Sequence, residues 1–85
     1  MEIEQTGEFE KDVKRSDRAL KQRLNETIHK ILENPRIGKP LEHLHFVFSI
    51  RILNKRLIYQ FKDNKILLVC FKSREEVYDY LRTRL

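Results

Sequence analysis

The sequence contains very few of the residues that crosslink or interrupt a chain. It has one cysteine, two glycines, two prolines and no tryptophan. A single cysteine excludes an internal disulfide and a cysteine-based zinc site, and so little glycine and proline argues against a flexible linker or a disordered tail. No long apolar run is present, and no basic start is followed by an apolar segment. We therefore expect neither a membrane span nor a signal peptide, and we expect the protein in the cytoplasm.

The 85 residues, of which 40% are hydrophobic, suffice for one small two-layer domain. We therefore expect a single domain over residues 1–85. This length excludes a TIM barrel, a doubly wound dinucleotide-binding domain and any large closed substrate cavity.

Positive charge is concentrated in the C-terminal half of the chain. The 18 basic residues exceed the 13 acidic ones, which gives a net charge of +5. Residues 1–45 are balanced, with nine of each sign, whereas residues 46–85 carry nine basic and four acidic residues. Such an imbalance indicates a polyanionic partner, either a nucleic acid or an acidic protein segment. Ordinary solubilising charge is the alternative interpretation.

The hydrophobic pattern of the N-terminal half predicts a strand and two helices. Residues 1–5 alternate apolar and polar as in a strand, and Phe9 and Val13 have the spacing of a short amphipathic helix. A longer helix begins after the Ser16–Asp17 cap and ends at Asn34–Pro35, because proline restricts the residue before it and has no amide hydrogen. Its apolar face is formed by Leu20, Leu24, Ile28, Ile31 and Leu32.

The C-terminal half predicts a three-stranded meander followed by a helix. A loop over residues 36–45 leads to strands at 46–53, 56–62 and 65–72, and a short helix follows over 74–85. The two-residue turns are Asn54–Lys55 and Asp63–Asn64. The fold class is therefore α+β: an N-terminal strand, a two-helix segment, a three-stranded antiparallel meander and a short C-terminal helix.

The turn at Asn54–Lys55 would place Leu53 opposite Arg56 and assign every strand residue to one face of the sheet. The long helix should cover the core face, which comprises Phe48, Ile50, Ile52, Leu57, Tyr59, Phe61, Ile66, Leu68 and Cys70. The other face mixes cationic, polar and apolar residues, and comprises Val47, Ser49, Arg51, Arg56, Ile58, Gln60, Lys62, Leu67, Val69 and Phe71. That face is either an open binding surface or the seat of the C-terminal helix.

The sequence offers no clear metal or nucleophile site. His43 and His45 are close together, but His29 is distant, so we expect no metal and no cofactor. Cys70 is expected in the core as a small buried side chain rather than as a nucleophile. Neither a glycine-rich phosphate loop nor a pair of catalytic carboxylates is present.

Several motifs resemble the RelE/ParE toxins of type II toxin–antitoxin modules, most closely the RelE/YoeB branch of mRNA interferases. The motifs are Lys55-Arg56-Leu57-Ile58-Tyr59-Gln60-Phe61, Lys72-Ser73-Arg74-Glu75-Glu76-Val77-Tyr78, the helix end at Glu33-Asn34-Pro35 and the Gly38-Lys39-Pro40-Leu41 loop. The resemblance implies a RelE-like fold and cleavage of mRNA in the ribosomal A site. It also implies a partner antitoxin that neutralises the toxin.

The resemblance also implies roles for particular residues. Arg56 matches the strand arginine that contacts the scissile phosphate, and Tyr78 matches the tyrosine that stacks on or orients a base. Lys72 lies where many members have an arginine that acts as the acid or stabilises charge, and lysine can supply a proton if neighbouring cations lower its pKa. Arg74 joins these three as a candidate catalytic residue through a phosphate contact, and we expect further RNA contacts from Arg51, Ser49, Lys55 and Lys62. Without the resemblance, Arg56 is equally a solvated arginine after a turn, and Tyr78 an anchor for the last helix.

The chain departs from the family at the general base. Val47 and Ser49 occupy the positions where the RelE branch has lysines, and Ser73 lies where the YoeB branch has a histidine. Glu42, His43 and His45 are the remaining candidates.

Two other functions stay open on the sequence: a ParE-like poison of DNA gyrase, and a weakly catalytic co-repressor that acts with its antitoxin. In each case the antitoxin should be acidic and partly disordered, to complement the positive charge. Operator DNA would be bound only through the antitoxin, and no membrane contact is expected.

Overall fold

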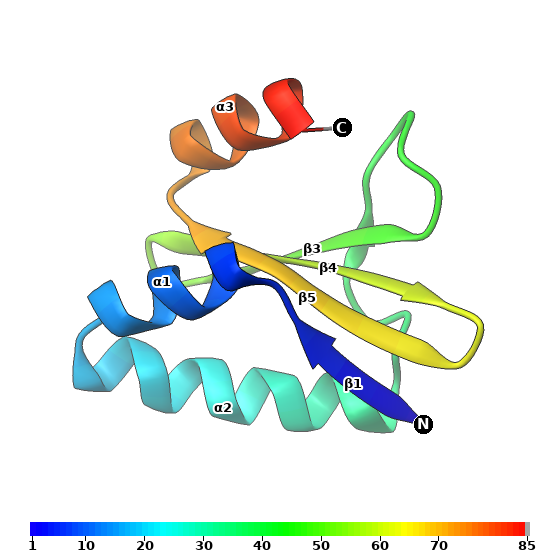
Figure 1. Ribbon diagram of the computed structural model, residues 1–85. Helices are drawn as coiled ribbons and strands as arrows, with labels where there is room; N and C mark the ends of the chain where they lie inside the picture. The colour runs from blue at the N-terminus through cyan, green and yellow to red at the C-terminus, as the bar shows by residue number, and fades with distance from the viewer. Residues whose placement is uncertain (85) are drawn as a thin grey trace.

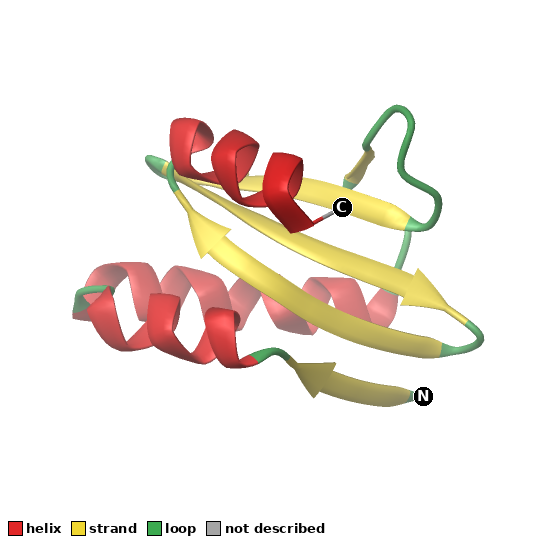
Figure 2. Ribbon diagram, turned by 45° about the horizontal axis from the view of Figure 1, so that its top comes forward, coloured by secondary structure: helices red, strands yellow, loops and turns green. Residues whose placement is uncertain are grey.

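A computed structural model describes residues 1–84 as an open sheet with helices on both faces. The strand order is β1-β5-β4-β3-β2. Helices α1 and α2 lie against one face and α3 lies over the other (Figures 1 and 2). The elements are β1 (Glu2–Gln5), α1 (Gly7–Arg15), α2 (Arg18–Glu33), β2 (Lys39–Pro40), β3 (Val47–Ile52), β4 (Lys55–Lys62), β5 (Lys65–Lys72) and α3 (Arg74–Arg84). The predicted α+β class and order of elements are confirmed, and Leu85 of the predicted last helix lies outside the described residues.

Two pairings complete the sheet beyond the predicted meander. Strand β1 runs parallel to β5, with Glu2 opposite Lys65, so the chain's first strand pairs with its last. Strand β2, inside the predicted loop, pairs with β3 and forms the opposite edge. The meander is therefore flanked on both sides.

Both N-terminal helices begin at side-chain caps. The Thr6 hydroxyl accepts a hydrogen bond from the Phe9 amide at 3.0 Å, and the Asp17 carboxylate accepts one from the Leu20 amide at 2.9 Å. Each cap satisfies an amide that has no partner within its helix. The predicted start of the long helix at Asp17 is thereby confirmed.

The register of the β3–β4 hairpin differs by two residues from the prediction. Ile52, rather than Leu53, begins the pairing and lies opposite Lys55, so the turn consists of Leu53 and Asn54. The shift stacks the Phe48 and Tyr59 rings, with their centroids 5.3 Å apart. The free energy gained by this stacking offsets the cost of leaving the Leu53 side chain 50% exposed. Because the shift is even, no side chain changes face. The predicted turn at Asp63–Asn64 is confirmed, with both residues at positive φ.

A bulge in β5 corrects the predicted faces at the end of that strand. Tyr59 pairs with Leu68 and Ile58 with Cys70, so Val69 is the extra residue between them. One extra residue reverses the alternation of side chains. Phe71 therefore lies in the core beneath α1 and α2, whereas Cys70, predicted on that face, lies on the α3 side.

The face that bears the cations is partly covered by α3. Val77 of α3 packs with Val47, Ile58 and Cys70 in a second apolar cluster, so the alternative in which the C-terminal helix lies over this face is confirmed. Burial raises the pKa of the Cys70 thiol to about 12. Within residues 1–84, no helix has the length and apolar character needed to cross a bilayer.

Helix α1 continues along the edge of β5 where β1 ends. The Thr6 amide and hydroxyl donate to the carbonyl oxygens of Leu68 and Val69, at 3.1 and 2.6 Å. The Asp12 carboxylate accepts from the Phe71 amide at 3.0 Å. These contacts satisfy backbone groups that an edge strand otherwise leaves free.

Candidate nucleic-acid interface

Four of the predicted site residues line one hollow at the end of the sheet. Arg51, Lys55, Arg56 and Arg74 surround a cavity of about 280 Å³, together with Asn54. No acidic side chain is among these lining residues. The hollow therefore concentrates positive charge and presents several hydrogen-bond donors, as an anion site requires. We call it the basic hollow.

The register of the sheet places three cations in a row across this end. Arg51 lies opposite Arg56, and Arg56 lies opposite Lys72. Like charges on directly opposed residues destabilise a sheet. Glu8 and Asp12 neutralise Lys72, so the like-charged pair that remains in the row is Arg51 with Arg56.

Helix α3 carries Arg74 and Tyr78 on successive turns. The Arg74 guanidinium lies 5.7 Å from the centre of the Tyr78 ring, and Tyr78 is 61% exposed. Ser73 begins the helix and exchanges hydrogen bonds with Glu76, and these bonds lower the pKa of the Glu76 carboxyl. Since Tyr78 contributes little to the core, it is available to a ligand rather than an anchor for α3.

Tyr78 also lines a second cavity, of about 520 Å³, between α3 and the segment before β3. We call it the tyrosine hollow. Its apolar lining comes from Pro40, Leu41, Leu44 and Leu81, and its charged residues are Lys39, Glu42 and Arg82. Arg74 belongs to the basic hollow and contacts Tyr78 of the tyrosine hollow, so the two cavities are linked along α3.

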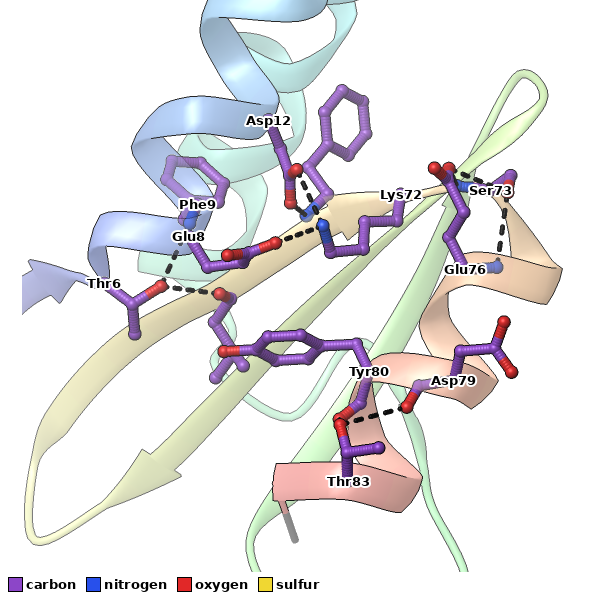
Figure 3. Close-up of polar contacts among 12 residues, drawn as sticks. Thr6, Glu8, Phe9, Asp12, Lys72, Ser73, Glu76, Asp79, Tyr80 and Thr83 are labelled. Carbon is purple, nitrogen blue, oxygen red and sulfur yellow. Dashed lines mark hydrogen bonds and ion pairs between the residues drawn. The ribbon is translucent and has the colours of Figure 1, made fainter.

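Lys72 lies beside the basic hollow but is held by carboxylates (Figure 3). It is 7% exposed, and its ammonium group donates to Glu8 and, at 2.9 Å, to Asp12. Burial alone would lower the pKa of this ammonium group, but the bonds to Glu8 and Asp12 outweigh burial and raise it. The condition for proton donation by Lys72, a pKa lowered by neighbouring cations, is therefore not met, because the groups that bind its ammonium are negative.

No local pattern in the sequence points to the partners of Lys72. Glu8 and Asp12 are one turn apart on α1, and only the fold brings them to the end of β5. The Tyr80 ring of α3 lies on another side of the ammonium group, 5.4 Å away (Figure 3). Helix α1, strand β5 and helix α3 thus meet at this one cation.

Two predicted RNA contacts lie away from the basic hollow. Ser49 is 6% exposed on the face of β3 that α3 covers, and its hydroxyl has no hydrogen-bond partner among residues 1–84. Lys62 is at the other end of β4 from Arg56, and its ammonium group lies 5.3 Å from the centre of the Phe46 ring. Their RNA-binding roles stay predictions.

Of the three candidate general bases, Glu42 lines the tyrosine hollow together with Tyr78. His43 and His45 are exposed in the same segment. Among residues 1–84, no group of three histidine, cysteine or acidic side chains is arranged to hold a metal ion.

The chain is similar to known toxins in both sequence and fold. The family model described as the ParE-like toxin of type II bacterial toxin–antitoxin systems matches residues 3–82. A mutant of the Escherichia coli RelE toxin in the free state superposes with a TM-score of 0.83 at 21% identity, covering 99% of this chain and 97% of that chain.

Two further structures resemble this chain. The YoeB dimer of Staphylococcus aureus has a TM-score of 0.72 at 27% identity, covering 87% of this chain and 97% of that chain. The RelB–RelE antitoxin–toxin complex of Methanococcus jannaschii contains a chain with a TM-score of 0.75 at 21% identity, with coverage of 89% and 95%. No curated protein sequence matches significantly.

Proposed function

The chain belongs to the ParE-like toxins of type II bacterial toxin–antitoxin systems, and from that premise we propose that it is an endoribonuclease that cleaves mRNA in the ribosomal A site without a metal ion. The observation that carries the proposal is the basic hollow, in which Arg51, Lys55, Arg56 and Arg74 converge without a lining carboxylate. A phosphate in this hollow would relieve the repulsion between the opposed Arg51 and Arg56.

In this proposal the basic hollow binds the phosphate of one nucleotide, and the tyrosine hollow binds the adjacent base. Arg56 and Arg74 bind the scissile phosphate and stabilise the negative charge that builds on it during the reaction. Arginine suits this role because it stays charged and binds phosphate through two parallel hydrogen bonds. Tyr78, which is exposed beside Arg74, stacks on the adjacent base. Arg51 and Lys55 bind neighbouring phosphates.

The reaction is an attack by the ribose 2′-oxygen on the neighbouring phosphorus. The 2′-hydroxyl loses its proton to a base, the bond from phosphorus to the 5′-oxygen breaks, and that oxygen takes up a proton from a water molecule. The products are a 2′,3′-cyclic phosphate and a 5′-hydroxyl. Glu42 is the proposed base because it shares the tyrosine hollow with Tyr78. Lys72 supplies neither a proton nor net charge to the phosphate, because two carboxylates hold its ammonium group, and its role is to secure α1 against the end of β5 beside the basic hollow.

We further propose that an acidic, partly disordered antitoxin neutralises this toxin by covering its cations. The solved relatives include RelE bound to the antitoxin RelB. The net charge of +5 favours an acidic partner that folds on contact. Operator DNA would then be bound through the antitoxin.

Primer extension on a defined mRNA in a translating extract tests the proposal. The wild-type protein should produce new cuts within codons, and blocking translation should abolish them. Arg56→Ala should reduce cleavage by about 10²–10³-fold, as expected for a lost donor to developing charge. Tyr78→Ala should reduce cleavage less, because it removes stacking rather than charge stabilisation.

A matched variant controls for net charge. Lys21→Ala removes one positive charge from the exposed side of α2 and should leave cleavage unchanged. Uncut mRNA, with DNA cleavage complexes formed in the presence of gyrase, would reject the nuclease in favour of a gyrase poison. Equal loss of cleavage in Lys21→Ala and Arg56→Ala would show that only overall charge matters.

A further inference from the structure

Phe46 is an aromatic residue that the proposed active site does not use, and its backbone has an unusual conformation. Its φ is 67°, in the left-handed region where bulky side chains are rare. Its side chain is 50% exposed and belongs to neither apolar cluster. Its carbonyl oxygen accepts a hydrogen bond from the Phe61 amide at 2.9 Å, which fixes its place in the sheet. The core therefore does not explain why a phenylalanine is held in this strained conformation.

The Phe46 ring has a cationic and a polar side chain close by. The Lys62 ammonium group lies 5.3 Å from the ring centre, and the His45 ring centre lies 6.2 Å away. Lys62 forms no ion pair with any carboxylate among residues 1–84, although Asp63 follows it directly. An exposed ring beside an unpaired ammonium group offers a stacking surface next to a phosphate site.

We propose that Phe46 and Lys62 form a second contact for single-stranded RNA, with one unpaired base stacked on the Phe46 ring and its phosphate on Lys62. The inference rests on the proposed function only in taking RNA as the ligand. Lys62 is six positions along β4 from Arg56, about 20 Å at the rise of a strand. The contact is therefore distinct from the basic hollow and holds the strand at a second point.

A base suits this site better than an apolar protein segment. His43, His45 and Lys62, which surround Phe46 in sequence or space, are all exposed and polar. Protein docking favours a contiguous apolar patch, whereas stacking needs a single ring and a nearby cation. Because every base has a flat face, this contact should hold RNA without selecting its sequence.

The absence of tryptophan gives a direct test. Phe46→Trp introduces a single indole at the proposed contact, and a single-stranded oligoribonucleotide should quench its fluorescence to saturation. Leu32→Trp is the matched control, because Leu32 is 38% exposed on α2, and its indole should not respond. Adding Lys62→Gln to Phe46→Trp should weaken binding and lower the slope of log K against log [salt] by about 1.

The variant Phe46→Gly distinguishes an effect on RNA binding from an effect on the stability of the fold. Phe46→Gly should weaken RNA binding about 5- to 150-fold, the range expected for one lost stacked base. The same change should leave the Tm unchanged or raise it, because glycine adopts positive φ without strain. Phe46→Ala should lose binding equally without the gain in Tm. Undiminished binding by Phe46→Gly would overturn the proposal.

The readouts distinguish this contact from the proposed active site. Quenching at position 46, together with cleavage that does not depend on Arg56, would support the contact and reject the active site. Cleavage that depends on Arg56, without quenching at position 46, would do the reverse. Quenching by purified antitoxin but not by RNA would overturn the proposal by assigning the ring to a protein interface.

Discussion

Replacing Lys72 with methionine should remove a large part of the stability of this domain. Lys72 is 7% exposed, and its ammonium group lies 2.9 Å from the carboxylate of Asp12, a residue that is 5% exposed. Breaking such a buried pair on one side costs about 3–5 kcal/mol, because the remaining charge has no partner. The lower end applies here, since Asp12 keeps the Phe71 amide as a donor and Glu8 reaches solvent. The whole free energy of unfolding of a domain of this length is about 4–13 kcal/mol.

Urea unfolding followed by circular dichroism measures this change. We expect Lys72→Met to lower the free energy of unfolding by about 3 kcal/mol, with little change in the m-value. The Tm should fall by about 12–24 °C, at 4–8 °C per kcal/mol for a domain of this size. Adding Asp12→Asn to Lys72→Met should restore about 1–2 kcal/mol of the free energy of unfolding, because asparagine is neutral and still accepts a hydrogen bond from the Phe71 amide.

The double mutant makes the reasoning refutable. If the ion pair matters, Asp12→Asn is destabilising with Lys72 present and stabilising without it. A Lys72→Met protein within about 0.5 kcal/mol of the wild type would refute the account, since that is the scatter of ordinary surface substitutions. Additive effects of the two changes would refute it as well.

Three smaller predictions follow from single groups. Gly38→Ala should cost about 1–3 kcal/mol in thermal unfolding, because the new Cβ would lie 2.9 Å from the Tyr59 hydroxyl oxygen, whereas Gly7→Ala, whose Cβ meets nothing within 4 Å, should not destabilise. The Cys70 thiol, with its pKa raised to about 12 by burial, should resist iodoacetamide at pH 8 until urea unfolds the chain, and labelling of the folded protein at the rate of a free thiol would contradict this. The hydrogen bond from Lys72 lowers the pKa of Glu8 below 4.5, so the stability that it contributes is complete above that pH and is lost as pH falls through the folded-state pKa. The Tm of Glu8→Gln should therefore fall less than that of the wild type between pH 7 and pH 3, and equal losses would contradict the assignment.

Local patterns in the sequence were enough to predict the helices and the meander. Caps such as Asp17 and the turn at Asp63–Asn64 act through residues next to one another, so their chemistry is visible in the sequence. The misplaced hairpin turn, now at Leu53–Asn54, arose because the stacking of Phe48 on Tyr59 outweighed the preference of polar residues for the turn. Because the predicted register was wrong by two residues, an even number, Arg51 and Arg56 were still predicted on the same face of the sheet.

What the sequence could not provide depends on contacts between distant residues. The bulge at Val69 is fixed where Thr6 and Asp12 bind the edge of β5, about 60 positions away in the chain. It moved Cys70 and Phe71 to opposite faces from those predicted. Glu8 and Asp12 are equally far from Lys72 in the chain, so the sequence does not show that they bind it. The cations of the site could therefore be predicted, but not that Lys72 among them is neutralised.

The parallel pairing of β1 with β5 has a consequence for how the protein is made. Glu2 to Gln5 find their partners only at Lys65 to Leu68, and α1 is secured only when Lys72 is present. A chain still being synthesised therefore lacks the partner of β1 until β5 has emerged from the ribosome. Residues that line the basic hollow extend to Arg74. The toxin should consequently be inert as a nascent chain, and an antitoxin can be present before the first active molecule folds.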